Sequence, residues 1–447
     1  MGGLLQHLGD TGLMARVLRS TSWIMLGYGA SQGLRLGSNL ILTRILYPEA
    51  FGLMALISLV TVGLMLFSDV GIAPSIAQSK RGDDPDFLNT AWSIQVVRGL
   101  CLWLIASGLA APLSGFYSAP ELKLYLPIAA LALLVSGFNP TRIETAHRHL
   151  LMGRLTLLDL ASQLIGILAM IALAWWWQSV AALVVGGVIA ALAKLALTWT
   201  GLPGASNRFR FERRAFAELV GFGKWVFLST VFWFFASQGD KAVLGKYLSL
   251  ETLGVYNIGF FLASFPLLLG AGVTGRVMIP VYRDAKHQTR KIASLRYGLS
   301  GVILVLLLGM ALAGPWLVGV MYDVRYAQAG AMVTLLALAL APQVIGLTYD
   351  QAALAAGDSR RFFIVTATRA VLQISFLVVG VIGFGLIGAL VGMGLAQLLT
   401  HAAVVWLARV HEVWDLRHDV LTGGIAALVA CLALWLHQDV LVALAAG

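Results

Sequence analysis

Residues 23–52 read WIMLGYGASQGLRLGSNLILTRILYPEAFG, and residues 225–254 read WVFLSTVFWFFASQGDKAVLGKYLSLETLG. At an offset of 202 residues, six positions match in type and spacing. The matched pairs are Trp23 and Trp225, Leu42 and Leu244, Arg44 and Lys246, Leu46 and Leu248, Glu49 and Glu251, and Gly52 and Gly254. The chain is therefore an internal duplication, and its two halves are predicted to share one fold. Each copy predicts a long apolar helix, a short charged hinge and the start of a second helix.

The composition is that of an integral membrane protein. Of the 447 residues, 59% are apolar and only 12% are charged, whereas soluble domains carry about 25% charged residues. Apolar runs of about 20 residues are long enough to cross a hydrocarbon core of roughly 30 Å, and backbone amides in lipid must be paired within the segment. An all-α membrane protein follows. The expected spanning helices cover 20–46, 50–78, 88–111, 121–141, 155–177, 179–200, 215–247, 251–278, 292–320, 327–356, 361–382, 385–408 and 420–436.

The distribution of basic residues predicts the orientation of these helices. With the N-terminus in the cytoplasm, the inner connections hold 21 of the 31 lysines and arginines and the outer connections hold four. The positive-inside rule therefore predicts a cytoplasmic N-terminus. The same rule accounts for most of the +10 net charge, so no nucleic-acid partner is indicated.

The repeat also predicts the domain organisation. An N-terminal six-helix bundle is expected over 1–200, a basic cytoplasmic linker over 201–214 and a C-terminal six-helix bundle over 215–409. Residues 410–447 are expected to form a cytoplasmic turn and about one extra membrane segment. The first helices of both bundles run outward, so the repeats are parallel, and transporters built in this way hold their substrate between the halves.

Six cations are expected inside the membrane, where each costs at least about 2.5 kcal/mol on insertion scales and should face protein or water. In the first helix Tyr28, Gln32, Arg35 and Asn39 share one face, which predicts a polar stripe along a cavity. The candidate substrate-binding residues are Arg35, Arg98, Lys224, Lys241, Arg369, Gln32, Asn39 and Gln373. The alternative is that a cation pairs with an acid or extends to the surface, and we favour the surface for Lys194.

Acidic residues near helix ends are interpreted as gates, caps or partners of cations. Asp69 and Asp350 fall near predicted inner ends, and Asp240 falls near an outer end. The candidate gating or coupling residues are Asp69, Arg44, Glu49, Lys246, Glu251, Asp240 and Asp350. No phosphate-binding loop, zinc-protease motif or nucleophile elbow occurs, so neither ATP-driven transport by this chain nor enzymatic catalysis is expected. The histidines lack metal-ligand spacing, and no metal or catalytic residue is predicted.

Glycines recur every fourth residue in two of the expected helices. They are Gly29, Gly33 and Gly37 in the first helix and Gly388 and Gly392 in the twelfth. Small residues at this spacing allow helix backbones to approach closely. Close helix contacts are therefore expected at both places.

The residues around the first repeat resemble the polysaccharide-exporter, or Wzx-type O-antigen flippase, branch of the MOP superfamily. The matching runs are Leu42 to Leu46, Phe51 to Leu53, Asp69 to Ala73, Ser75 with Ile76, and Gln78. The sequence looks most like the colanic-acid type of exporter. The resemblance implies two six-helix bundles that rock around a central cavity and carry an undecaprenyl-diphosphate-linked oligosaccharide from the inner to the outer leaflet. Members usually have two helices after this core, whereas here the chain after residue 436 is too short for a fourteenth spanning helix.

The function expected from the sequence is therefore export of a lipid-linked oligosaccharide for surface polysaccharide assembly, across a bacterial inner membrane. Anion movement would be driven by the membrane potential or by H⁺ or Na⁺, with no cofactor, and polymerase or chain-length machinery would be a partner. Three alternatives stay open. They are a lipid-II-type flippase, a cation-coupled multidrug extruder of the same superfamily, and a lipid-linked sugar polymerase or ligase.

Overall fold

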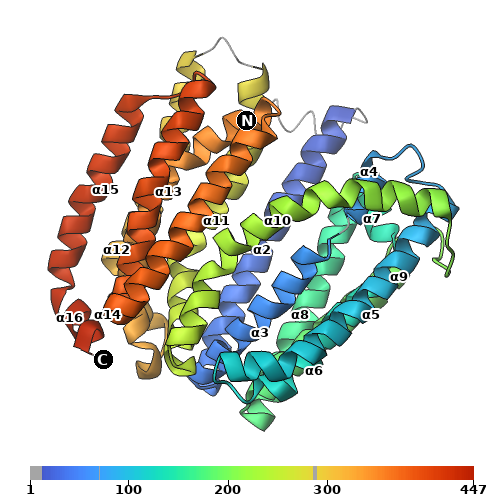
Figure 1. Ribbon diagram of the computed structural model, residues 1–447, viewed down its shortest axis with the longest axis horizontal. Helices are drawn as coiled ribbons and strands as arrows, with labels where there is room; N and C mark the ends of the chain where they lie inside the picture. Colours follow the sequence, from blue (N-terminus) through green and yellow to red (C-terminus); the bar gives the residue numbers. More distant parts are fainter. Residues whose placement is uncertain (1–12, 70, 285–288, 447) are drawn as a thin grey trace. The chain divides into compact units, whose positions relative to one another are not determined.

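The computed structural model describes the backbone of residues 13–69, 71–284 and 289–446, and the side chains of 20–69, 71–219, 230–283 and 290–444 (Figure 1). Throughout these residues the regular structure is helical. The elements are α2 (Leu13–Ile45), α3 (Pro48–Phe67), α4 (Ile72–Gln78), α5 (Pro85–Phe116), α6 (Leu122–Gly137), α7 (Arg142–Arg148), α8 (Met152–Trp177), α9 (Val180–Gly201), α10 (Arg213–Tyr247), α11 (Leu250–Asp284), α12 (Thr289–Met321), η1 (Val324–Tyr326), α13 (Gln328–Ala355), α14 (Ser359–Val410), α15 (Leu416–Leu436) and α16 (Gln438–Ala446).

The predicted all-α membrane fold is confirmed. Nine of the described helices are long and apolar enough to cross a membrane, or ten if α6 and α7, which meet at 61°, form one bent span. The expected eleventh and twelfth helices are merged in α14, where Phe384 and Gly385 have non-helical backbone angles. α2 is not among the nine, because it carries more polar residues than the other long helices. Part of α10 lies outside the residues whose side chains are described.

One expected helix is broken. The segment predicted over 50–78 ends as α3 at Phe67 and resumes as α4 at Ile72. Gly71 caps α4 with a φ of 67°, in the left-handed region that glycine tolerates best. Its amide donates to Oδ1 of Asp69 at 2.9 Å, so the acid predicted as a gate shapes the break.

Two compact units divide the chain. Unit 1 comprises Met1–Leu46 and Ile57–Val231, and unit 2 comprises Tyr47–Leu56 and Phe232–Gly447. The division falls inside α3 and inside α10. The four segments expected from the sequence stay a prediction.

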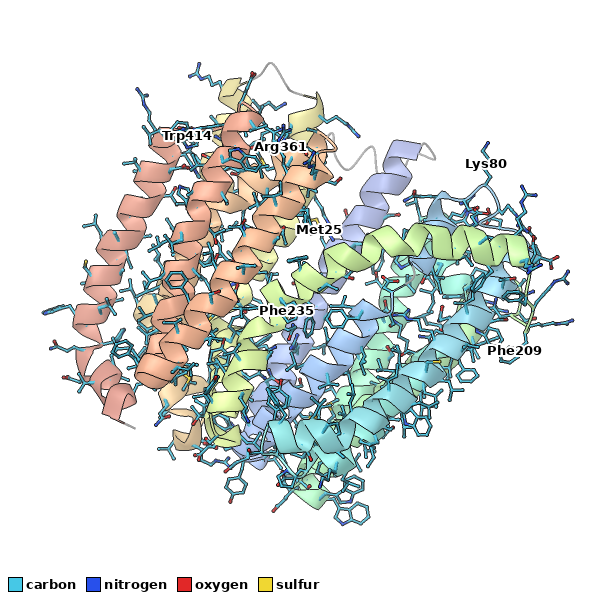
Figure 2. All side chains as sticks on the ribbon, viewed as in Figure 1. Met25, Lys80, Phe209, Phe235, Arg361 and Trp414 are labelled. Carbon is cyan, nitrogen blue, oxygen red and sulfur yellow. The ribbon has the colours of Figure 1, made fainter. Side chains whose placement is uncertain are left out.

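In unit 1, helices pack through small residues. Gly99 of α5 and Gly137 of α6 leave no room for side chains, since a Cβ on Gly99 would lie 3.0 Å from the Gly137 Cα. α2 packs on α8, where the Ser31 hydroxyl donates to Oε1 of Gln163 at 2.7 Å. The segment after α9 lies on α5, where Phe209 stacks on Trp92 with ring centroids 4.8 Å apart. Figure 2 shows the side chain of Phe209 at the surface of this unit.

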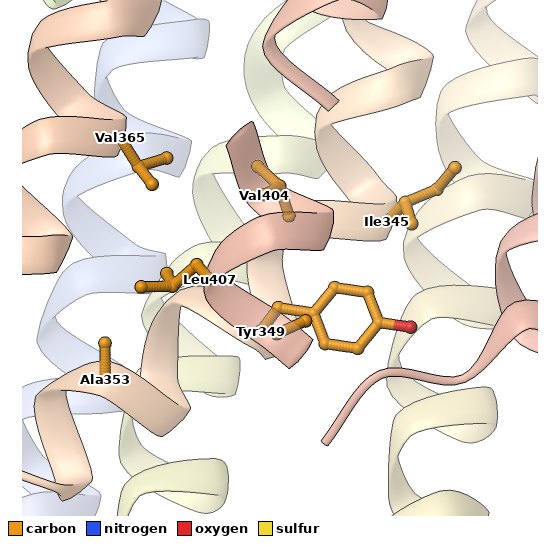
Figure 3. Close-up of a cluster of buried hydrophobic side chains, with 7 residues drawn as sticks. Ile345, Tyr349, Ala353, Val365, Val404 and Leu407 are labelled. Atoms are coloured by element: carbon orange, nitrogen blue, oxygen red, sulfur yellow. The ribbon is translucent and has the colours of Figure 1, made fainter. Parts of the chain in front are cut away.

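Unit 2 is built around α13, of which 72% is buried in its most apolar window. α13 packs against α11, α12 and α14. Figure 3 shows the cluster in which Ile345, Tyr349 and Ala353 of α13 meet Val365, Val404, Leu407 and Ala408 of α14. α15 and α16 pack on this core.

The two stretches that reveal the duplication meet within unit 2. A Cβ on Gly52 would overlap the carbonyl oxygen of Leu250 and lie 3.1 Å from the Gly254 nitrogen. Conversely, a Cβ on Gly254 would overlap the carbonyl oxygen of Pro48 and lie 3.0 Å from the Gly52 nitrogen. The contact is reciprocal, so equivalent positions of the repeat face each other where α3 and α11 begin.

The predicted close contacts at the other glycines are confirmed in α14 but not in α2. Gly388 and Gly392 do allow close contact, because a Cβ on either would overlap the carbonyl oxygen of Gly380 or Phe376. The prediction for α2 is wrong. Nothing in the described structure lies within 4 Å of a Cβ placed on Gly29, Gly33 or Gly37, because the face of α2 that packs on α8 carries Ser31 instead.

Candidate functional site

The polar stripe of α2 lies on a different face from the one that packs on α8. Nε2 of Gln32 donates to the Tyr28 hydroxyl at 3.0 Å, so these residues are neighbours along the helix as their spacing predicted. Gln32 is buried, Asn39 is half-buried and Arg35 is exposed. The stripe therefore presents one guanidinium at the middle of a long helix of a membrane protein.

The side chain of Arg98 in α5 donates hydrogen bonds to the C-terminal end of α3. Its Nη2 donates to the carbonyl oxygen of Met65 at 2.7 Å, and its Nε donates to the Ser68 hydroxyl at 2.9 Å. The last carbonyl groups of a helix have no hydrogen-bond partner within the helix, and a cation near this end also interacts favourably with the helix dipole. Arg98, predicted to bind substrate, thus has a structural partner in α3.

A cavity of about 200 Å³ opens beside this helix break, wholly within unit 1. Asp69, Gln95, Arg98 and Glu144 supply its charged and amide groups. The rest of its lining is Met65, Ile72, Ala73, Gly99, Leu102, Leu133, Ser136 and Gly137. Two residues predicted in different roles, Arg98 and Asp69, are therefore brought to one site, and Gln95 of α5 and Glu144 of α7 join them.

In unit 2 the predicted cation Arg369 and the predicted gate Asp350 form a pair. Nη2 of Arg369 lies 3.3 Å from Oδ2 of Asp350, and both side chains are largely buried. In the described part of the chain, Oδ1 of Asp350 and Nε of Arg369 have no hydrogen-bond partner. The pair joins α13 to α14, so the alternative in which an intramembrane cation pairs with an acid describes Arg369. Lys194 also contacts an acid, since its Nζ lies 2.9 Å from Asp159, but both side chains are more than a third exposed, and its extension to the surface stays a prediction.

Asp240 is buried at the end of α10. Its Oδ2 accepts a hydrogen bond from the Tyr256 hydroxyl of α11 at 2.7 Å, while its Oδ1 has no hydrogen-bond partner among the described residues. The neighbouring Lys241 donates to Oε1 of Gln238, three residues before it in α10, at 3.2 Å. Gln373 is buried, with its Oε1 3.5 Å from Nε2 of Gln397.

The charged hinge residues of the repeat are surface residues. Arg44, Glu49, Lys246 and Glu251 are all exposed. The side chain of Lys224 lies outside the described residues. The roles assigned to all of these residues stay predictions.

The sequence reasoning missed a buried polar cluster that fixes the start of α15. Asp419 accepts hydrogen bonds from the Tyr349 hydroxyl at 2.7 Å and from Nε1 of Trp414 at 3.0 Å. His418 and His401 lie 3.2 and 3.5 Å from the same carboxylate. Residues 410–447 were expected to form a cytoplasmic turn and about one extra membrane segment, and no polar cluster was predicted there. The signal was the adjacent His418 and Asp419 one turn after Asp415.

A second missed cluster fixes the linker before α10 to the turn before α5. Nη2 of Arg81 lies 2.6 Å from both Glu212 and Asp84. The hydrogen bond from Arg81 holds the pKa of the Glu212 carboxyl below its usual value, and it does the same for Asp84. The amides of Arg208 and Glu212 donate to side chains of α5. The linker is therefore bound along α5.

The fold defines the class of protein: a multi-pass, all-helical membrane protein. The structure aligns with the lipid II flippase MurJ in an inward closed conformation, with a TM-score of 0.69 and 12% identity over 93% of this chain and 98% of MurJ. It also aligns with an inward-facing multidrug resistance MATE family transporter of the MOP superfamily, with a TM-score of 0.59 and 14% identity over 87% of this chain and 94% of that one.

The sequence comparison identifies the family. The profile described as "polysaccharide biosynthesis protein" matches residues 41–329, and the chain belongs to this family. It is 23% identical over 402 residues to the succinoglycan biosynthesis transport protein ExoT of Rhizobium meliloti (strain 1021), covering 88% of this chain and 80% of ExoT. The resemblance expected from the first repeat is therefore confirmed.

Proposed function

We propose that this protein is a flippase that carries an undecaprenyl-diphosphate-linked oligosaccharide from the inner to the outer leaflet for surface polysaccharide assembly. The observation that carries the proposal is Arg35, an exposed guanidinium in the polar stripe of α2. Its context supports the same function: the family is that of polysaccharide biosynthesis proteins, and the fold is shared with a lipid II flippase.

The chemistry of the substrate explains why a cation is needed. A diphosphate must leave water to cross the membrane interior, and a guanidinium offers a charge-assisted, two-pronged partner for phosphate oxygens. Arg35 lies in the polar stripe of α2, and Asn39 extends the same polar face. Arg35 is therefore our choice for contact with the head group.

We also propose a driving force and a membrane location for transport. With a cell interior that is negative, an anion is driven outward by about 2.3 kcal/mol per charge for each 100 mV. We propose that this potential, with or without H⁺ or Na⁺ exchange, drives the cycle in a bacterial cytoplasmic membrane, with the N-terminus inside. A polysaccharide polymerase would take up the product. A lipid-II-type flippase shares this chemistry and differs only in the sugar.

A reconstituted flipping assay tests the role of Arg35. Proteoliposomes would contain the purified protein and a fluorescent lipid-linked oligosaccharide, with a potassium diffusion potential of either sign. The wild-type protein should flip the lipid faster when the potential drives the anion in the direction of flipping than when the potential has the opposite sign. Arg35→Ala should lower the rate at least tenfold, whereas Arg35→Lys should retain much of it and Gly29→Ala, on the same helix, should retain all of it. Full activity of Arg35→Ala would remove this residue from the mechanism.

A further inference from the structure

The break between α3 and α4 has no counterpart in the second repeat. At the 202-residue offset, Ser68–Gly71 corresponds to residues 270–273, which lie inside the continuous helix α11. α3 alone is long enough to cross a membrane, so the break lies at the end of a span. Asp69 and Arg98 line a polar cavity beside it.

The charges in this cavity are also specific to the first repeat. Asp69, Arg98 and Glu144 line it. Their counterparts at the same offset are Ala271, Ser300 and Gly346. The second half, in which the corresponding helix α11 is unbroken, carries no charged residue at any of these three positions. The three charges therefore belong to the broken helix and to the cavity beside it.

The lining selects the chemical class of that ligand. Asp69 and Glu144 repel an anion such as phosphate, and the Arg98 guanidinium repels a second cation. A neutral polyol satisfies both, because each hydroxyl group can donate to a carboxylate and accept from a guanidinium or amide. Ile72 and Leu133 offer apolar contacts for the carbon side of a ring, the mixture of apolar walls and a few polar groups that is typical of small-molecule sites.

The size of the cavity agrees with this class. About 200 Å³ corresponds to the share of roughly six or seven water molecules in the liquid. A dehydrated ion would leave most of that volume unfilled. A single sugar ring is of this size. Gly99 and Gly137 form part of the wall, where α5 and α6 pack backbone to backbone.

We propose that this cavity binds one sugar residue of the transported glycan, with Asp69 and Glu144 as hydroxyl acceptors and Arg98 and Gln95 as polar neighbours. The proposal rests on the proposed flippase function, because it assigns the diphosphate and the sugar of one substrate to different places. Arg35 would contact the diphosphate, and the cavity would contact the sugar.

Binding of two lipids to the full-length protein in nanodiscs tests this assignment. The probes are undecaprenyl diphosphate and undecaprenyl diphosphate carrying one hexose, titrated by native mass spectrometry. Glu144→Gln and Asp69→Asn should each weaken binding of the hexosyl lipid about tenfold, the effect of losing one hydrogen bond to a charged group. Binding of the bare lipid should not change. Arg35→Ala should weaken both, and Glu121→Gln, at an exposed acid of the same unit, should change neither.

Each other result overturns the assignment in a recognisable way. If Glu144→Gln and Asp69→Asn weaken neither lipid, or both equally, the cavity holds no sugar while the flippase proposal stands. If hexosyl-lipid binding persists but sodium or proton binding is lost in Glu144→Gln, the cavity is a cation site. If the wild-type protein binds neither lipid, the proposed function itself fails.

Discussion

Gly52 and Gly254, equivalent residues of the two repeats, pack against each other so closely that neither position has room for a side chain. The backbone nitrogen of each lies 3.0–3.1 Å from the place that a Cβ on the other would occupy. A duplication detected as a sequence offset is thus also a reciprocal contact in space. It joins the starts of α3 and α11 within unit 2.

Replacing either glycine should therefore be costly, and equally so. In Gly52→Ala and Gly254→Ala the new methyl group meets backbone carbonyl oxygens, which cannot move as a side chain can. A loss of about 1–3 kcal/mol of stability or more is expected, seen as a lower melting temperature and yield in detergent.

Gly29→Ala is the matched control, since its Cβ meets nothing within 4 Å. Its stability should be unchanged or higher by up to about 1 kcal/mol, because alanine favours the helix. Similar behaviour of the three variants would show that the contact between the repeats is not close.

The ion pair between Asp350 and Arg369 should behave as a coupled unit. Removing one partner leaves a largely buried charge without its counterion, so Asp350→Asn or Arg369→Gln alone should destabilise unit 2 by about 3 kcal/mol. The double variant should cost less than the two single losses together. Thermal unfolding of the four proteins gives the coupling energy, and strict additivity would mean that the two charges do not interact.

Asp419 should be needed to hold α15 on the core. In Asp419→Ala the Tyr349 hydroxyl and the Trp414 indole lose their acceptor, and unsatisfied buried donors cost about 1–3 kcal/mol each. Hydrogen exchange should then increase in α15 before it increases in α13. Asp439→Ala, at an exposed acid of α16, provides the comparison, and equal exchange in both variants would count against the cluster as an anchor.

The linker contact should depend on pH. Arg81 depresses the pKa of Glu212 and of Asp84, so the folded contact favours the ionised carboxylates. Its stabilisation is complete above the unfolded carboxyl pKa of about 4 and is lost as pH falls through the lower folded values. Exchange of the Arg210 and Glu212 amides, corrected for intrinsic rates, should stay constant from pH 8 to 5 and rise in more acidic solution.

In Arg81→Gln the same amides should exchange faster across the whole range. Lys80→Gln is its neighbour control, because Lys80 is an exposed residue of the same turn. If acid exposed the linker equally in wild-type and Arg81→Gln proteins, the ion pair would not be what holds it.

Local patterns in the sequence predicted what depends on local geometry. The helices, the repeat and the neighbouring pair Tyr28 with Gln32 follow from apolar run length and helical spacing. The break at Asp69 was not predicted, because the apolar run continues through it. The glycine rule failed in α2 since spacing places residues on one face without saying whether another helix lies there.

Contacts between distant segments could not be read from the chain. Arg369 and Asp350 are separated by a turn between two helices, and Tyr349 and Asp419 are 70 residues apart. Each charge alone was recognised as needing a partner, but pairing requires the packing of α13 against α14 and α15. Glu144 was missed for the same reason, because only the bend between α6 and α7 brings it to the cavity.

The lipid-linked oligosaccharides of a strain lacking this protein test the central claim most directly. They would be measured by mass spectrometry, with surface polysaccharide assayed in parallel and the gene restored in a complemented strain. The flippase account predicts accumulation of an undecaprenyl-diphosphate-linked oligosaccharide, loss of surface polysaccharide, and reversal of both on complementation. An unchanged lipid pool with intact polysaccharide and increased sensitivity to cationic drugs would contradict it and indicate a multidrug extruder.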